Sequence, residues 1–174
     1  MWVVVRQSCW YGAASLVRSL LRSTMSEVHT VDIREVPAGE TRLARQAMCA
    51  LRGAWENEQQ FVGHVDEVMR PAGYRLIGAF LPGKEQAVAV AGFRVGDNLA
   101  WGRFLYVDDL STAPEGRRQG HAGALLDWLV GEGRRLGCDQ LHLDSGVGPE
   151  RFDAHRLYHG HGLAIYSHHF ARGL

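Results

Sequence analysis

A helical segment that lies between two strand-like segments is the feature that most limits how this chain can fold. Residues 100–111 alternate as a strand does, residues 119–136 carry a stripe of apolar side chains at helical spacing, and residues 140–144 form a second short strand. A strand, a helix of this length and another strand form a βαβ crossover, because parallel neighbours need a long connection. The sequence therefore predicts a mixed α/β domain with a parallel strand pair.

The other segments predict antiparallel strands around this crossover. Further strands are expected at residues 29–33, 74–81, 87–95 and 164–170. Turn residues such as Pro82-Gly83 and Gly96-Asp97-Asn98 separate three consecutive strands, as in a meander. Further helices are expected at residues 41–52, 58–69 and 151–161, from the spacing of their apolar residues.

Length and charge indicate one domain that follows a separate N-terminal segment. The 174 residues suit a single domain, and 19 basic against 19 acidic residues give a formal net charge of zero. Residues 1–26 hold three arginines and no acid, so they carry +3, while residues 27–174 hold 16 basic and 19 acidic groups and carry −3. We interpret residues 1–26 as an extension upstream of a start at Met25 and outside the fold; a transit-type peptide and a membrane-surface helix are the alternatives. Residues 27–174 are expected to form the single domain.

Composition argues against several classes of protein. A near-zero charge does not suit a protein that coats nucleic acid or anionic lipid, and no run of about 18 apolar residues could span a membrane. Three cysteines are too few for a disulfide framework or a four-ligand zinc site, and nine histidines include no HExxH motif. We therefore expect no metal, no nucleic-acid or membrane partner, and a reduced, cytoplasmic setting.

The turn that opens the crossover helix is suited to bind an anion. It reads Arg117-Arg118-Gln119-Gly120-His121-Ala122-Gly123. The first amides of a helix lack internal partners and carry partial positive charge, and the small residues let an anion approach the backbone. The two arginines add positive potential. These residues predict a cradle for a phosphate or pyrophosphate, although the nucleotide-hydrolase and dinucleotide fingerprints are absent.

The same run resembles the acetyl-CoA-binding motif of the GNAT superfamily of N-acetyltransferases, [QR]-x-x-G-x-[GA], which follows a strand that ends in V-x-P. Here Thr112-Ala113-Pro114 precedes it. Residues 151–163 resemble the family's final helix, N-x-x-A-x-x-[LF]-Y-x-x-x-G-[FL], with Arg151 in place of the asparagine that commonly contacts the pantetheine arm. The resemblance covers about residues 28–170. It implies a mostly antiparallel central sheet of six to seven strands, flanked by about four helices, with the crossover at the CoA site.

The resemblance also implies roles for individual residues. Backbone groups of Leu110, Ser111 and Thr112 would pair with the pantetheine of acetyl-CoA, the co-substrate. Arg117 and Arg118 would contact its phosphates, and amides from Arg118 through Gly123 would hold the pyrophosphate. Tyr158 would act as the general acid that returns a proton to the CoA thiolate, since a phenol with a pKa of about 10 can donate to a thiolate whose parent thiol has a pKa of about 8.5.

Asp108 and Asp109 are the candidates for the group that takes a proton from the acceptor amine. They lie just before the CoA-binding segment, where family members often carry an acidic pair. Period-two alternation points them to opposite faces, so only one is expected to face the acceptor. Asp108 is the first choice as base or amine anchor, acting directly or through water. A carboxylate that caps or solvates a strand end is the alternative.

Together these features predict transfer of an acetyl group from acetyl-CoA to a primary amine, by direct attack in a ternary complex. No Cys–His or Ser–His–Asp arrangement supports a covalent acyl-enzyme. The acceptor is left open between a polyamine-like compound, an amino acid, a drug amine and a protein amine. A non-catalytic acyl-CoA-sensing or interaction module on the same fold is the alternative.

Because the family often pairs its sheets into dimers, a homodimer is a further expectation. Packing is favoured over pocket lining for Trp55, Trp101 and Trp128.

Overall fold

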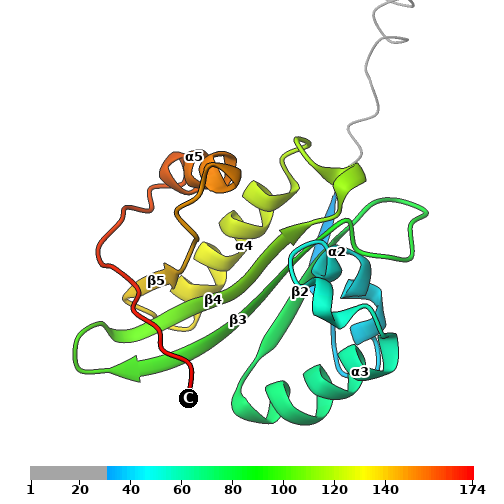
Figure 1. Cartoon of the computed structure of the whole chain (residues 1–174), viewed down its shortest axis with the longest axis horizontal. Helices are drawn as coiled ribbons and strands as arrows, with labels where there is room; N and C mark the ends of the chain where they lie inside the picture. Colours follow the sequence, from blue (N-terminus) through cyan, green and yellow to red (C-terminus); the bar gives the residue numbers. More distant parts are fainter. Residues whose placement is uncertain (1–30) are drawn as a thin grey trace, which may run out of the picture. The chain divides into compact units, whose positions relative to one another are not determined.

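A computed structural model of the chain describes residues 31–174, in which helices cover both faces of a five-stranded sheet (Figure 1). The strands are β1 (Asp32–Glu35), β2 (Arg75–Phe80), β3 (Ala89–Asn98), β4 (Gly102–Thr112) and β5 (Gln140–Leu143). The interpretation of residues 1–26 and the expected start of the first strand at residue 29 lie outside the described residues.

The strands lie in the sheet in their sequence order. Neighbouring strands are antiparallel from β1 to β4, and β4 and β5 are parallel. The connection between the parallel strands contains α4 (His121–Arg135), so the predicted βαβ crossover is confirmed. Gly137, which follows this helix, has a left-handed φ of 71°. A glycine is the residue that adopts this conformation without strain, which explains why the helix ends here.

The other predicted helices also form. A 3₁₀ turn over Thr41–Ala44 leads into α2 (Arg45–Cys49), and α5 (Phe152–Gly160) follows a 3₁₀ turn over Pro149–Arg151. The helix expected at residues 58–69 begins as α3 (Glu58–Gly63) and continues as a π-helix over His64–Met69. Within residues 31–174, no helix is both long enough and apolar enough to cross a bilayer.

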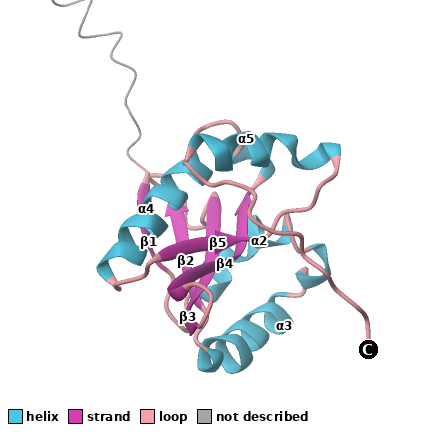
Figure 2. Ribbon diagram, turned by 90° about the vertical axis from the view of Figure 1, so that its left-hand side faces the viewer, coloured by secondary structure: helices cyan, strands magenta, loops and turns pink. Residues whose placement is uncertain are grey.

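The core lies in two layers, one on each face of the sheet. On one face, residues of α2 and α3 such as Met48 and Phe61 pack with Leu76 of β2. On the other face, α4 supplies Leu125, Leu126 and Leu129, which pack with residues of β2, β3 and β4. Because both faces are covered, β2 is almost continuously buried rather than alternating. Figure 2 shows α4 and α3 on opposite sides of the strands.

The strand predicted at residues 164–170 does not form. Residues 163–174 contain neither strand nor helix, and the sheet of the described chain has five strands rather than six to seven. Ile165, Tyr166 and Phe170 are 77%, 90% and 90% exposed. The residues favour a strand locally, but a strand also needs a neighbour that supplies hydrogen bonds, and no described strand pairs with this segment.

Candidate functional site

The turn between β4 and α4 leaves backbone amides free at the start of the helix. The chain leaves β4 at Thr112 and passes through a 3₁₀ turn over Pro114–Gly116 before α4 begins. The amide of Ala124 donates to the carbonyl of Gly120 at 3.0 Å. The amides of His121, Ala122 and Gly123 precede this first helical bond, so they are available to a ligand.

Two residues of this turn have a left-handed backbone conformation. Gly120 has a left-handed φ of 83°, and Arg118 has a left-handed φ of 60° although it carries a side chain. This conformation costs a non-glycine residue about 1–3 kcal/mol and is concentrated at ligand-binding sites. Arg117, Arg118 and Gln119 are exposed, so their polar groups can reach a ligand.

The last helix packs against this cradle. A Cβ on Gly123 would lie 3.0 Å from Nε2 of His161 and 3.7 Å from Cδ1 of Leu157, so glycine allows α5 to approach the first turn of α4. His161 Nδ1 lies 3.0 Å from a carboxylate oxygen of Asp127 in α4. The side chain of His121 is buried, at 7% exposure, and its Nε2 has no hydrogen-bond partner among the described residues. Burial lowers the pKa of this histidine.

The end of β4 has one free edge. On one side, Leu110, Ser111 and Thr112 pair with β3. On the other side, the pairing with β5 covers Phe104–Val107 and stops there within the described chain. Ser111 also donates its hydroxyl proton to the carbonyl of Ala47 at 2.6 Å, which ties β4 to α2. An extended ligand could therefore add to the open edge of β4, as a strand would.

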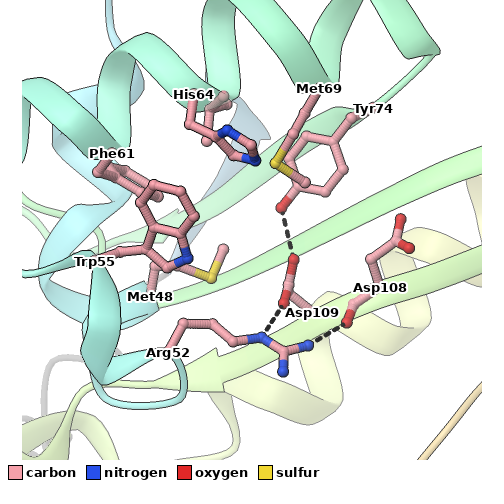
Figure 3. A pocket seen from close by; sticks show the side chains of 10 residues that line it. Met48, Arg52, Trp55, Phe61, His64, Met69, Tyr74, Asp108 and Asp109 are labelled. Carbon is pink, nitrogen blue, oxygen red and sulfur yellow. Dashed lines mark hydrogen bonds and ion pairs between the residues drawn. The ribbon is translucent and has the colours of Figure 1, made fainter. Parts of the chain in front are cut away.

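A pocket of about 260 Å³ lies where β4 faces α2 and α3 (Figure 3). It is lined by Met48, Arg52, Trp55, Phe61, His64, Val65, Met69, Tyr74, Asp108 and Asp109. These residues come from α2, the connection between α2 and α3, α3 with the π-helix that follows it, the residue before β2, and the middle of β4. Trp55 packs against the core cluster, as expected, and also lines the pocket, so for this residue packing and pocket lining occur together. The lining does not include Trp101 or Trp128.

Both aspartates line the pocket because β4 carries a bulge. Gly92 of β3 pairs with Asp109, whereas the next residue, Phe93, pairs with Val107, so Asp108 is an extra residue in β4. Where two residues of one strand oppose one residue of its partner, the alternation of faces is interrupted. The expectation that Asp108 and Asp109 point to opposite faces is therefore wrong.

Asp109 is buried, and each of its carboxylate oxygens accepts a hydrogen bond. It is 8% exposed, its Oδ1 accepts from Nε of Arg52 at 2.8 Å, and its Oδ2 accepts from the hydroxyl of Tyr74 at 2.9 Å. Burial, followed by the charge and hydrogen bond of Asp109, raises the pKa of Tyr74 well above its ordinary value. Tyr74 therefore keeps its proton and donates it in the hydrogen bond to Asp109.

Asp108 is held by a different arginine. Nε of Arg94 donates to Asp108 Oδ2 at 3.0 Å, and a second nitrogen of the same guanidinium contacts Oδ1. The hydrogen bond with Asp108 raises the pKa of Arg94. The guanidinium of Arg52 also donates to the backbone carbonyl of Asp108, at 3.2 Å. Each carboxylate thus forms an ion pair with one arginine, so the two negative charges of the aspartates are balanced by two positive charges.

Tyr158 lies on α5, outside the residues that line the pocket. It is half-buried and packs against the same core layer as α4. Burial raises its pKa, and the nearby charge of Arg151 partly offsets this effect. The structure therefore joins Asp108 and Asp109 in one pocket, places residues 117–123 at the start of α4, and places Tyr158 on the helix that covers that start.

Arg52, Arg94 and Tyr74 belong to the site, although nothing in the sequence pattern singled them out. Arg52 and Tyr74 reach Asp109 across 57 and 35 residues of sequence, so no local spacing could reveal them. Among residues 31–174, no group of three or more His, Cys, Asp or Glu side chains is arranged to hold a metal ion.

Comparison with known proteins gives a match to one family. Residues 34–163 match the family model described as the acetyltransferase (GNAT) family. A search of curated protein sequences found no significant match.

Solved structures share the fold at low sequence identity. A transcriptional regulator from Bacillus halodurans C-125 aligns with a TM-score of 0.70 at 20% identity, over 83% of this chain and 99% of that chain. An acetyltransferase from Trypanosoma brucei aligns with a TM-score of 0.68 at 17% identity, over 83% and 99%. An aminoglycoside acetyltransferase from an uncultured soil metagenomic sample gives 0.67 at 18% identity, also over 83% and 99%. At these identities the likeness supports the fold alone.

Proposed function

Since the chain belongs to the GNAT acetyltransferase family, whose members use acetyl-CoA as co-substrate, we propose that it transfers the acetyl group of acetyl-CoA to a primary amine. One observation carries this proposal: β4 separates from β5 after Val107, and this open edge runs between the amides at the start of α4 and the pocket that contains both aspartates. A thioester bound along this edge would have its phosphates at one end and the acceptor pocket at the other.

The residues proposed to bind acetyl-CoA are those that the family resemblance implies, and this geometry supports them. The backbone of Leu110, Ser111 and Thr112 would pair with the pantetheine arm along the open edge of β4. Amides from Arg118 through Gly123, which include those of Gln119, Gly120, His121 and Ala122, would hold the pyrophosphate, and Arg117 and Arg118 would contact the phosphates. Acetyl-CoA supplies the acetyl group as a thioester.

The aspartates would prepare the amine for attack. An ammonium group has no lone pair, so it must lose a proton before it can attack the thioester carbonyl. Asp108 is the proposed acceptor of this proton, directly or through water, because it lines the pocket at the point where β4 opens. Both oxygens of each aspartate accept hydrogen bonds, from Arg94 for Asp108 and from Arg52 and Tyr74 for Asp109. The side chain of Asp109 is the more deeply buried of the two, so its proposed role is to position Arg52 and Tyr74.

Tyr158 would complete the reaction. As the amine nitrogen bonds to the carbonyl carbon, the C–S bond breaks and the sulfur leaves as a thiolate. Burial raises the pKa of Tyr158, so its hydroxyl keeps a proton that it can give to this thiolate. The reaction then passes through a ternary complex without an acyl-enzyme.

Two glycine variants test the binding step. Gly120 and Gly137 both have left-handed φ values, 83° and 71°, and no heavy atom lies within 4 Å of a Cβ built on either. Alanine therefore costs similar backbone strain at both positions, but only position 120 belongs to the cradle. We expect Gly120→Ala to weaken acetyl-CoA binding at least ~10-fold in calorimetry, with Gly137→Ala close to the unmodified chain. Equal effects would remove the cradle from the binding site.

Release of the CoA thiol with a panel of amines tests catalysis. We expect amine-dependent release that Asp108→Asn lowers by about 100-fold, whereas Asp97→Asn, which alters a carboxylate paired with Arg103 outside the pocket, should leave the rate unchanged. Tight binding of acetyl-CoA without release for any amine would contradict the catalytic proposal and favour a non-catalytic acyl-CoA-sensing module.

A further inference from the structure

The wall of the pocket opposite the aspartates is apolar and largely aromatic. It contains the rings of Trp55 and Phe61 and the thioethers of Met48 and Met69. Phe61 and Met48 are 2% and 3% exposed, and Trp55 packs against their core cluster. In Figure 3, Trp55 and Asp108 lie on opposite sides of the pocket. A ligand that reaches Asp108 therefore has its remaining part against this wall.

Flat surfaces dominate this wall. The rings of Trp55 and His64 are stacked, with centroids 4.6 Å apart and planes 25° from parallel. Aromatic groups prefer offset or edge-to-face contacts with such rings, and methionine side chains adapt to a ring beside them. The wall thus favours a flat apolar group over a flexible polar chain.

The charges of the site limit the charge of the ligand. Arg52 is paired with Asp109 and Arg94 with Asp108, so the pocket offers no unmatched carboxylate. A single ammonium group can give up its charge when it loses the proton that the reaction requires. Additional ammonium groups would stay charged and lack partners beside the apolar wall, which is unfavourable.

The size of the pocket limits the size of the ligand. Its volume of about 260 Å³ is just below the range of about 300–1,000 Å³ that is usual for ligand pockets. This space suits one ring with a short chain better than a multi-ring drug or a folded peptide.

We propose that the acceptor is a small monoamine whose amino group is joined by a short chain to an aromatic ring. This inference rests on the proposed function, because it assigns the acceptor of the same site. The ring would lie against Trp55 and Phe61, and the amino group would lie at Asp108, where β4 opens towards the thioester.

Three amines distinguish the possibilities in a thiol-release assay with the full chain and acetyl-CoA. We expect kcat/KM for 2-phenylethylamine to exceed that for butylamine, which lacks the ring, and that for spermidine, which carries several charges, by at least ~10-fold. A value for butylamine or spermidine equal to or above that for 2-phenylethylamine would overturn the inference but leave acetyl transfer standing. No release with any of the three amines would overturn the inference together with the proposed catalysis at this pocket.

A pair of tryptophan variants tests the wall itself. Trp55→Ala should raise KM for 2-phenylethylamine by about 10-fold, with kcat and the KM for acetyl-CoA little changed. Trp101→Ala is the matched control, because Trp101 also stacks on a histidine, His142, at 3.9 Å between centroids, but lies outside the pocket. An unchanged KM for 2-phenylethylamine in Trp55→Ala, or an equal rise in Trp101→Ala, would overturn the assignment of the wall.

Discussion

Gly92 is the residue that lets Tyr74 reach Asp109, so Gly92→Ala tests the geometry of the site. Gly92 pairs with Asp109 at the bulge, and a Cβ there would lie 1.7 Å from the hydroxyl oxygen of Tyr74 and 2.2 Å from Cζ. Tyr74 is 3% exposed, so its ring is packed among protein groups. Alanine at position 92 therefore forces the ring away and breaks the 2.9 Å hydrogen bond to Asp109.

The expected loss of stability has two parts. Overpacking a filled core costs about 1–3 kcal/mol. A lost hydrogen bond to a charged acceptor costs about 1.5–3 kcal/mol. The sum predicts that Gly92→Ala lowers the free energy of unfolding by about 4 kcal/mol, a large share of the roughly 5–15 kcal/mol typical of a domain.

Urea unfolding followed by tryptophan fluorescence measures this loss. With a slope of about 2 kcal/mol per molar urea, the midpoint should fall by about 2 M. Gly131→Ala is the control: position 131 lies inside α4 with no atom within 4 Å of a Cβ, so alanine there should stabilise the chain by about 0.5–1 kcal/mol. The double variant Gly92→Ala/Tyr74→Leu, which removes the clashing ring, should recover part of the loss. A Gly92→Ala midpoint equal to that of the unmodified chain would refute the contact between Gly92 and Tyr74.

Three further predictions concern ionisable groups. Hydrogen bonds from Arg135, and then from Arg75, lower the pKa of buried Glu132 from 4.5 to about 2, so this stabilisation is present above pH 4.5 and is lost as the pH falls towards 2. Glu132→Gln should cost about 2 kcal/mol at pH 7 and much less at pH 3 in urea unfolding, and an equal cost at both pH values would contradict it. Burial lowers the pKa of His121 below 6.5, so its contribution to stability falls as the pH drops below 6.5. His121→Leu should therefore lose less stability between pH 7 and 5 than the unmodified chain, an effect that the exposed control His168→Leu should not reproduce. Tyr158→Phe should lower kcat for thiol release by about 100-fold and leave acetyl-CoA affinity within about 2-fold, with Tyr166→Phe, at 90% exposure, as control; an unchanged kcat would exclude Tyr158 as the acid.

The crossover and the turn that opens its helix could be predicted because their signals are local. The apolar stripe of α4, the glycine that ends it and the glycine that precedes it all act within a few turns of helix. Each of these residues determines the conformation of its own segment, so neighbouring positions in the sequence were sufficient. The same reasoning succeeded for the helices at residues 41–52, 58–69 and 151–161.

Pairing between distant segments could not be predicted in this way. The strand expected at residues 164–170 has suitable side chains, but a strand also requires a neighbour, and the sequence of the segment contains no information about one. The partners of the aspartates show the same limit. Arg52 lies in the chain between two helices and Arg94 lies in β3, and only the packing of α2 and β3 beside β4 brings them to Asp109 and Asp108.

The bulge in β4 is the clearest case, because it leaves no trace in the pattern of buried residues. From Phe104 to Thr112 burial alternates, with buried residues at Leu105, Val107, Asp109 and Ser111. Yet Leu105 and Val107 pack in the core layer of α4, whereas Asp109 bonds to Tyr74 and Ser111 to Ala47 in the layer of α2. A covered sheet buries a side chain on either face, so the strand can change faces at Asp108 without altering the alternation. Period-two alternation therefore predicts which residues of such a strand are buried, but not on which face of the sheet each one lies. The change of face at the bulge brings the two adjacent carboxylates into one pocket.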